Sequence, residues 1–239
     1  MPREAAANAV SYGRRMAYEI SIWLLPVLIA VTFHEAAHGF VAHLLGDDTA
    51  WWLGRVTFNP WKHVDPVGTI LLPAILLLMR SPFLFGYAKP VPVNFRALRN
   101  PRIGTILVAA AGPGINLLLA IIAALAFHLV GYLPLIAGEW AAQNLKNAVV
   151  INVVLAIFNL LPLPPLDGGR IAVSALPGPL GYSLSRLEPL GFPILIGLLF
   201  VLPLMGAQLG LNLNFLSQLI GSSANGVIEL VLRLTGNVA

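Results

Sequence analysis

ISIWLLPVLIAVTFHEAAH, residues 20–38, places two histidines and a glutamate at the end of an apolar stretch long enough to enter a membrane. Residues 20–33 carry no charged side chain. His34 and His38 are four positions apart, so on a helix they lie on one face, about one turn apart. Two imidazoles at this spacing can bind one zinc ion, and Glu35 lies between them. Ionisable groups inside an apolar segment are costly, which favours a functional role for all three.

The composition of the whole chain is that of a membrane protein. Of 239 residues, 58% are hydrophobic and 10% are charged, whereas soluble domains carry about 25% charged residues. The mean hydropathy is +0.83. We therefore expect an all-α polytopic membrane protein, with residues 1–239 forming a single transmembrane domain in the lipid bilayer. No basic run is interleaved with aromatic residues, so no nucleic-acid partner is expected.

Apolar segments along the chain predict about five to six transmembrane helices. They lie at about 17–45, 67–86, 103–130, 145–163 and 189–207, with a weaker one near 213–235. Between them, LGRVTF at 53–58 predicts a short strand, and the proline-punctuated GYAKPVPVNFRALRNPR at 86–102 predicts an extended segment. We expect these two pieces to form a short membrane-associated β or extended region.

A catalytic zinc site needs a third protein ligand and an open position. The chain contains no cysteine, so this ligand must be His, Asp or Glu. Asp167 is the carboxylate in the most unusual setting, because Pro164 and Pro165 precede it and Gly168 and Gly169 follow it. A carboxylate held on such a turn can point at a metal, although it can also simply cap the turn.

At this point the chain resembles the site-2 protease family of intramembrane zinc metalloproteases, peptidase family M50. HExxH and a later N-x-x-P-x-x-x-x-D-G segment define that family, and a glycine–proline element followed by an asparagine is similar to it. The stretches GRVTFNP and GYAKPVPVN resemble its compact bacterial members, which have no PDZ or CBS domain. The resemblance covers about residues 17–170, the expected catalytic core, with C-terminal helices at about 188–235. Its residues beyond HExxH are Gly112, Pro113, Asn116, Asn159, Pro162, Asp167 and Gly168.

The resemblance implies one Zn²⁺ per chain, bound by His34, His38 and Asp167. Glu35 would act as the general base that activates the attacking water and later protonates the leaving amine. Asn159 would orient the substrate or stabilise the developing oxyanion. Zinc and an amide donor aimed at the tetrahedral oxygen are physically suited to these tasks.

Several residues keep a second interpretation. Asn116 and Asn159 could serve as interhelical hydrogen-bond partners, and Gly112 and Pro113 could belong to helix packing instead of substrate positioning. The remaining histidines are expected to be structural: His43, His63 and His128.

The predicted site also constrains the topology. His38 lies near the C-terminal end of its helix, and Asp167 follows the C-terminal end of the fourth apolar segment. To meet at one zinc, these two helices must run in the same direction, with an odd number of crossings between them. Because 103–130 supplies one crossing, we expect 67–86 to be re-entrant, which suits its prolines and Arg80.

Charge then gives an orientation. This topology puts ten Lys and Arg residues, Arg233 among them, on the active-site side and four on the other. The positive-inside rule therefore places the active site near the cytoplasmic face. The resemblance to compact bacterial members implies that the membrane is a bacterial inner membrane.

The leading hypothesis is a zinc-dependent intramembrane endopeptidase. It would cut within or near transmembrane segments of single-span membrane proteins or peptides, in regulated proteolysis or in clearance of signal-peptide remnants. The substrate helix must first unwind, and a strand-like edge at 53–58 or 90–95 could hold it by strand addition. The alternatives are a divalent-metal transporter or metal-binding membrane protein without hydrolytic activity, and an inactive relative acting as a chaperone. A transporter would not need Glu35. The sequence leaves the oligomeric state open.

Overall fold

A computed structural model describes residues 2–78 and 86–238 of the chain. Within these ranges the chain is helical and contains no strand. Five helices in the described ranges are long and apolar enough to cross a membrane: Arg15–Leu44, Pro101–Tyr132, Leu135–Asn159, Glu188–Leu209 and Phe215–Leu234. The all-α class and the expected number of long apolar helices are confirmed.

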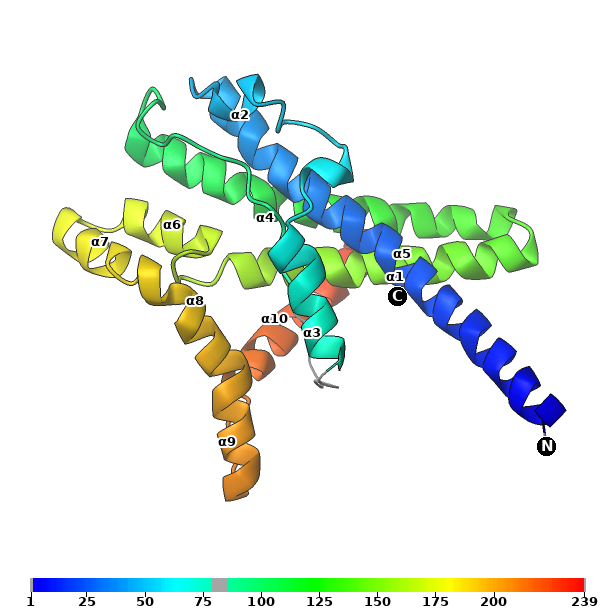
Figure 1. Cartoon of the computed structure of the whole chain (residues 1–239). Coiled ribbons are helices and arrows are strands. Elements are labelled where there is room, and N and C mark those ends of the chain that lie inside the picture. The colour runs from blue at the N-terminus through cyan, green and yellow to red at the C-terminus, as the bar shows by residue number, and fades with distance from the viewer. Residues whose placement is uncertain (1, 79–85, 239) are drawn as a thin grey trace.

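Three helices that pack against one another form the centre of the molecule (Figure 1): α1 (Pro2–Leu44), α4 (Pro101–Ala126) and α5 (Leu135–Asn159). The Arg99 backbone N–H donates to the Leu45 carbonyl (2.9 Å), so the end of α1 meets the start of α4. A short 3₁₀ helix, η3 (Phe127–Tyr132), turns the chain from α4 into α5. α1 and α5 therefore run in the same direction with α4 antiparallel between them, as the predicted metal site requires.

Buried amides satisfy backbone groups inside this layer. Pro26 lies within α1 and has no N–H, so the Ile22 carbonyl one turn earlier lacks its helical donor. Asn147 of α5 supplies one, since its Nδ2 donates to the Ile22 oxygen (2.9 Å). Such a bond ties two helices together where water has no access.

The connection between α1 and α4 is irregular. It contains three short helices and a π-helical turn: α2 (Thr49–Trp52), η1 (Pro60–Lys62), η2 (Pro66–Leu71) and α3 (Leu72–Leu78). The strand predicted at 53–58 is wrong, because Gly54, with φ +61°, and Arg55 continue the turn of α2 through bonds to Trp51 and Ala50.

Residues 86–95, which we name the strap, form no sheet strand either. Their backbone N–H groups donate to separate acceptors and not to a neighbouring strand. Lys89 donates to the His63 carbonyl (2.8 Å), and Val91 donates to the Glu35 carboxylate (2.8 Å). Pro90 and Pro92 have no N–H to offer to a ladder. The predicted β region is thus not formed.

The predicted re-entrant segment, 67–86, is only partly described, because 79–85 lie outside the described residues. The helical part that is described, 66–78, would be about 20 Å long, less than the roughly 30 Å of a hydrocarbon core. Residue 87 lies beside residues 68 and 69, near the beginning of the segment. The Tyr87 N–H donates to the Gly68 carbonyl (3.1 Å), and the Thr69 hydroxyl donates to the Tyr87 carbonyl (2.9 Å).

After α5 the chain forms six further helical elements: α6 (Asp167–Ala175), α7 (Gly178–Ser185), α8 (Glu188–Ile196), η4 (Gly197–Val201), α9 (Leu202–Leu209) and α10 (Phe215–Leu234). α8, η4 and α9 form one rod that projects away from the three-helix layer (Figure 1). α10 packs along α5.

The end of α10 corrects one part of the predicted topology. His128 Nε2 bonds the Thr235 carbonyl (2.7 Å), and Asn237 Nδ2 donates to the Ala124 carbonyl (2.9 Å). These contacts are with the C-terminal end of α4 and with η3, which follows it, opposite the end where α1 meets α4. Arg233 therefore lies at the other end of the molecule from the predicted active-site side, because α10 runs parallel to α4.

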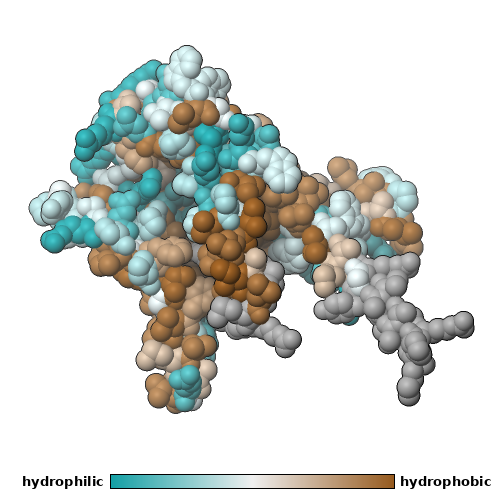
Figure 2. All heavy atoms as spheres, viewed as in Figure 1, coloured by the Kyte–Doolittle hydropathy of each residue, from teal (hydrophilic) through white to brown (hydrophobic). Residues whose placement is uncertain are grey.

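The two ends of the molecule differ in polarity. Figure 2 shows hydrophilic residues gathered over the end that carries α2, its following loops and α6–α7, and hydrophobic residues over α3 and α9. The C-terminal ends of α1 and α5 both point to that hydrophilic end (Figure 1).

Candidate metal centre

His34, His38 and Asp167 come together at one point. The two Nε2 atoms of the histidines are 3.0 Å apart, and Asp167 Oδ2 lies 3.2 Å from that of His34 and 3.4 Å from that of His38. Both histidines are buried. Across the part of the chain that the structure describes, this is the one cluster of three His, Asp or Glu side chains close enough to share a metal ion.

The turn that carries Asp167 depends on glycine. A side chain on Gly168 would run into the Leu160 carbonyl, and one on Gly169 would run into the backbone of Leu163 and Pro164. The chain after α5 thus folds tightly back on the start of α6, as the proline and glycine pattern predicts. This tight turn places the Asp167 carboxylate beside the histidines of α1.

The hydrogen bonds of the histidines leave the right atoms for a cation. Nδ1 of His34 bonds Asn116 Oδ1 (2.6 Å), and Nδ1 of His38 bonds the Val108 carbonyl (2.7 Å). Both partners are acceptors, so each Nδ1 carries the proton and each Nε2 presents a lone pair.

Asp167 completes the donor set. Its Oδ2 is buried and has no hydrogen-bond donor. Two imidazole nitrogens and a carboxylate oxygen facing one point, with no proton between them, are satisfied by a cation. Two nitrogens and one oxygen also match the protein ligands of a catalytic zinc site. The residues therefore fit zinc.

Gly112 gives the histidine rings their space. A Cβ at this position of α4 would lie 2.5 Å from both His34 Cε1 and His38 Nε2. Gly112 and its neighbour Pro113 are buried, and neither lines the cavity described below. The structure thus places both in helix packing behind the metal centre.

Asn116 lies behind His34 and does not line the cavity described below. Its side chain is fully buried (0% exposed) and also donates through Nδ2 to the Ala30 carbonyl (3.2 Å) and to Asn152 Oδ1 (2.8 Å). Asn152 was not singled out from the sequence. An isolated amide in an apolar helix was the available signal, but α5 contains four asparagines and the spacing does not distinguish among them.

A cavity of about 550 Å³ adjoins the three ligand side chains. Glu35 and Asn159 line it, together with the strap, the end of α5 and Phe192 and Leu195 of α8. The Glu35 Oε2 accepts the Val91 N–H (2.8 Å), and Asn159 Nδ2 donates to the Leu155 carbonyl (3.0 Å). The structure therefore brings both predicted catalytic side chains to the same space as the ligands.

The other three histidines have structural partners, as predicted. His43 stacks on Trp51 (4.4 Å between ring centroids) and its Nδ1 bonds Asp48 Oδ1 (2.5 Å). His63 Nε2 bonds the Thr57 carbonyl (3.0 Å), and His128 bonds the end of α10 as described above.

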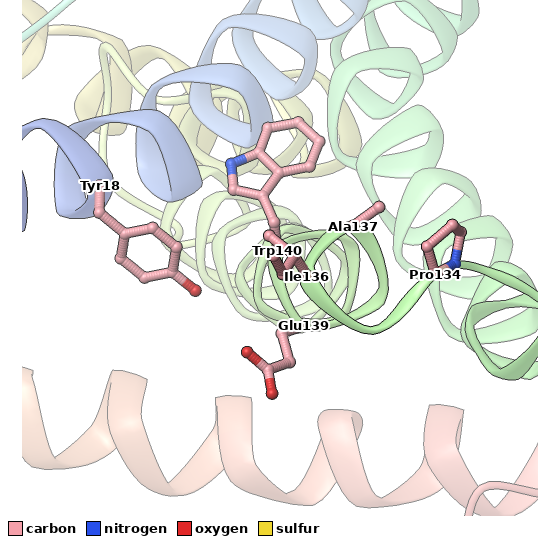
Figure 3. A pocket seen from close by; sticks show the side chains of 6 residues that line it. All are labelled: Tyr18, Pro134, Ile136, Ala137, Glu139 and Trp140. Carbon is pink, nitrogen blue, oxygen red and sulfur yellow. The ribbon is translucent and has the colours of Figure 1, made fainter.

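A second cavity, of about 580 Å³, lies at the opposite end of the molecule (Figure 3). It is formed where the first half of α1 passes the start of α5, and the indole of Trp140 projects from α5 toward α1. Trp140 Nε1 donates to the Ser21 hydroxyl (3.1 Å). Glu139 is its one carboxylate and no histidine lines it, so it offers no ligand set for a metal.

Comparison with known proteins gives an independent result. Residues 136–202 match the model of peptidase family M50. The chain is 40% identical over 185 residues to the protein named "Putative zinc metalloprotease YwhC" of Bacillus subtilis, covering 76% of this chain and 80% of that protein.

More distant relatives carry a similar name. "Putative zinc metalloprotease Rip2" of Mycolicibacterium smegmatis is 29% identical over 141 residues, and that of Mycobacterium tuberculosis is 30% identical over the same length. The match covers 59% of this chain and 52% of each Rip2 protein, about half their length. No solved structure matches the chain.

Proposed function

The chain belongs to peptidase family M50, and on that premise we propose that it cuts peptide bonds within or near the transmembrane segments of single-span membrane proteins. It is a zinc metalloendopeptidase and an integral multi-pass membrane protein. One observation carries the proposal: the metal cluster and Glu35 share one cavity at the end of a layer of long apolar helices.

His34, His38 and Asp167 would hold the zinc. Three protein ligands leave a fourth position, which the adjoining cavity leaves accessible to water and substrate. When bound, zinc supplies a Lewis acid that polarises the scissile carbonyl and acidifies water. Asn116 and the Val108 carbonyl hold the two imidazoles in the orientation and tautomer that this task needs.

Glu35 would be the general base. It takes a proton from the attacking water as the new C–O bond forms and gives it to the amine nitrogen as the C–N bond breaks. The Val91 N–H holds one of its oxygens, which fixes the carboxylate beside the ligands. Asn159, on the same cavity wall, would orient the substrate or donate to the oxyanion.

The strap is the better candidate for holding unwound substrate. Pro90, Val91, Val93 and Phe95 line the cavity, whereas residues 53–58 do not. The N–H groups of Lys89 and Val91 are already used, and Pro90 and Pro92 have none. The Val93 N–H would therefore be the strap donor that pairs with an extended substrate. Replacing Val93 with proline should impair cleavage with zinc still bound, and Val93→Ala is the matched control. Cleavage by Val93→Pro equal to that by Val93→Ala would dismiss this role.

The membrane arrangement is also a proposal. We place 67–86 as a re-entrant segment in a bacterial inner membrane, with the active site near the cytoplasmic face. The bonds of Tyr87 to Gly68 and Thr69 support this, because they hold the two described sides of the segment together. The chain has no cysteine, so single-cysteine variants can report orientation. Ser183→Cys should react with a membrane-impermeant maleimide from the cytoplasmic side, and Leu133→Cys from the other; the reverse pattern would invert the assignment.

Proteolysis itself is tested with purified protein in lipid and a panel of single-span substrates. Wild type and Glu35→Gln should both contain zinc, and wild type alone should cleave. Zinc in both with no cleavage of any substrate, together with zinc flux into liposomes, would favour transport instead. That alternative is not favoured by the present site, because transport needs no carboxylate such as Glu35 beside the ligands.

A further inference from the structure

We propose that Asn152 of α5 is a positioning residue of the metal centre, acting through Asn116 on the tautomer and orientation of His34. This inference rests on the proposed zinc site. It concerns a residue that touches neither the cavity nor any ligand atom directly.

The first step is the orientation of Asn152 itself. Its Nδ2 donates to the Ala148 carbonyl of its own helix (2.9 Å). The amide nitrogen is thereby turned toward α5, and Oδ1 is turned toward α4. There it accepts a hydrogen bond from Asn116 Nδ2 (2.8 Å).

In the second step, the orientation of the Asn152 amide fixes the orientation of the Asn116 amide. Its Nδ2 faces two oxygens, Asn152 Oδ1 and the Ala30 carbonyl of α1 (3.2 Å). A flipped amide would put Oδ1 against both acceptors, and neither could donate to it. Oδ1 of Asn116 is therefore directed away from Asn152 and toward α1.

The third step ends at the ligand. Asn116 Oδ1 can only accept, so Nδ1 of His34 (2.6 Å away) must carry the proton and Nε2 must present its lone pair to the metal. A chain of three side chains from α5, α4 and α1 thus connects a helix carbonyl to a zinc-binding nitrogen. Figure 1 shows these three helices side by side.

The hydrogen bonds that join Asn152, Asn116 and His34 are buried, so each partner is needed. Asn116 and Asn152 are 0% and 1% exposed, so bulk water cannot substitute for a missing partner. With no acceptor at position 152, the Asn116 amide loses one of the two contacts that oppose a flip. The flipped amide would present a donor to His34 and favour the wrong tautomer.

Asn147 provides a matched control on the same helix. It is also buried (7% exposed), and it also ties α5 to a neighbouring helix, because its Nδ2 donates to the Ile22 carbonyl of α1. Among the residues that the structure describes, no hydrogen bond connects Asn147 to the metal centre. If the α5 asparagines served only in packing, substitutions at 147 and 152 would change zinc affinity equally. If Asn152 is a positioning residue, only the substitution at 152 should weaken zinc binding.

The experiment measures the zinc dissociation constant of the full chain in detergent or lipid, by competition with a chelator. Asn152→Leu should weaken zinc binding about 10-fold, the lower end of the range for losing a ligand's own hydrogen-bond partner, because Asn152 acts one residue further from the metal. Asn147→Leu should stay within about threefold of wild type, a margin we set below that range. Equal affinity of Asn152→Leu and wild type, or equal losses at both positions, would overturn the proposal. Should either leucine variant fail to fold, the alanine pair at 152 and 147 decides by the same comparison.

Two further variants separate positioning from packing. Asn152→Asp, protonated in this buried place, can accept from Asn116 and donate to the Ala148 carbonyl, so it should restore zinc affinity to within about threefold of wild type, the margin used for the control. In an Asn116→Leu background, Asn152→Leu should cause no further loss, because its effect passes through Asn116. Additive losses, or an aspartate no better than leucine, would contradict the relay. A wild type that binds no zinc would instead defeat the proposed site itself.

Discussion

Replacing Gly112 with alanine should disrupt the metal centre without touching any ligand. The added Cβ would lie 2.5 Å from His34 Cε1 and from His38 Nε2, and 2.6 Å from His34 Nε2. Carbon atoms pack at about 3.5–4.0 Å, so the rings or α4 must shift by about 1 Å.

The rings have little freedom to yield. Each is held at Nδ1 by a short bond, 2.6 Å to Asn116 and 2.7 Å to the Val108 carbonyl, and both acceptors belong to α4, the helix that carries Gly112. A shift of α4 therefore moves the groups that orient the rings. Losing one such buried bond costs about 1–3 kcal/mol, and about 1.4 kcal/mol is tenfold in affinity. We expect zinc binding about 10- to 100-fold weaker, with cleavage reduced at limiting zinc.

The assay is zinc affinity by chelator competition, with Gly114→Ala as the control. Gly114 lies on the same helix, and a Cβ there would meet nothing within 4 Å. The zinc affinity of the Gly114→Ala variant should equal that of wild type. Unchanged zinc affinity in Gly112→Ala would refute the reasoning, because it would mean that the histidines do not depend on this close contact.

Three further results are expected. Glu35→Gln should lower the cleavage rate about 10²- to 10⁴-fold with zinc content unchanged, the range for loss of a general base; retained cleavage would remove Glu35 from that role. Asp47→Ala should lower the free energy of unfolding by about 2–4 kcal/mol, because the buried carboxylate accepts the Asn94 N–H of the strap (2.6 Å) as well as two donors of Thr49; an unchanged denaturation midpoint in detergent would contradict this. Removal of zinc by a chelator should abolish cleavage and added zinc should restore it, whereas Mg²⁺ should not, since the donor set contains two imidazoles.

Two predictions made from the sequence were wrong because contacts with other parts of the chain outweighed the local sequence pattern. Residues 53–58 have the composition of a strand, but no neighbouring strand exists in the described residues, and Gly54 continues the turn of α2. Arg233 was assigned to the active-site side on an assumed alternation of crossings. The contacts of Thr235 and Asn237 with the end of α4 show that α10 runs the other way.

The amino-acid sequence alone determined the all-α membrane class and brought out His34, Glu35, His38 and Asp167. These features are local: apolar composition, a four-residue spacing on one helix, and a turn forced by neighbouring prolines and glycines. The parallel course of α1 and α5 also followed, because two groups that share one metal must end at one depth.

Only the tertiary structure decided what surrounds those residues. The bond from Asn116 to His34 spans 82 positions, and the one from Asn152 to Asn116 spans 36. The space at Gly112 exists because α4 packs against α1 at that height, and the Val91 N–H reaches Glu35 because the strap crosses α1 there. Such contacts depend on which helix faces meet, and that outcome follows from packing the whole chain instead of from any one segment.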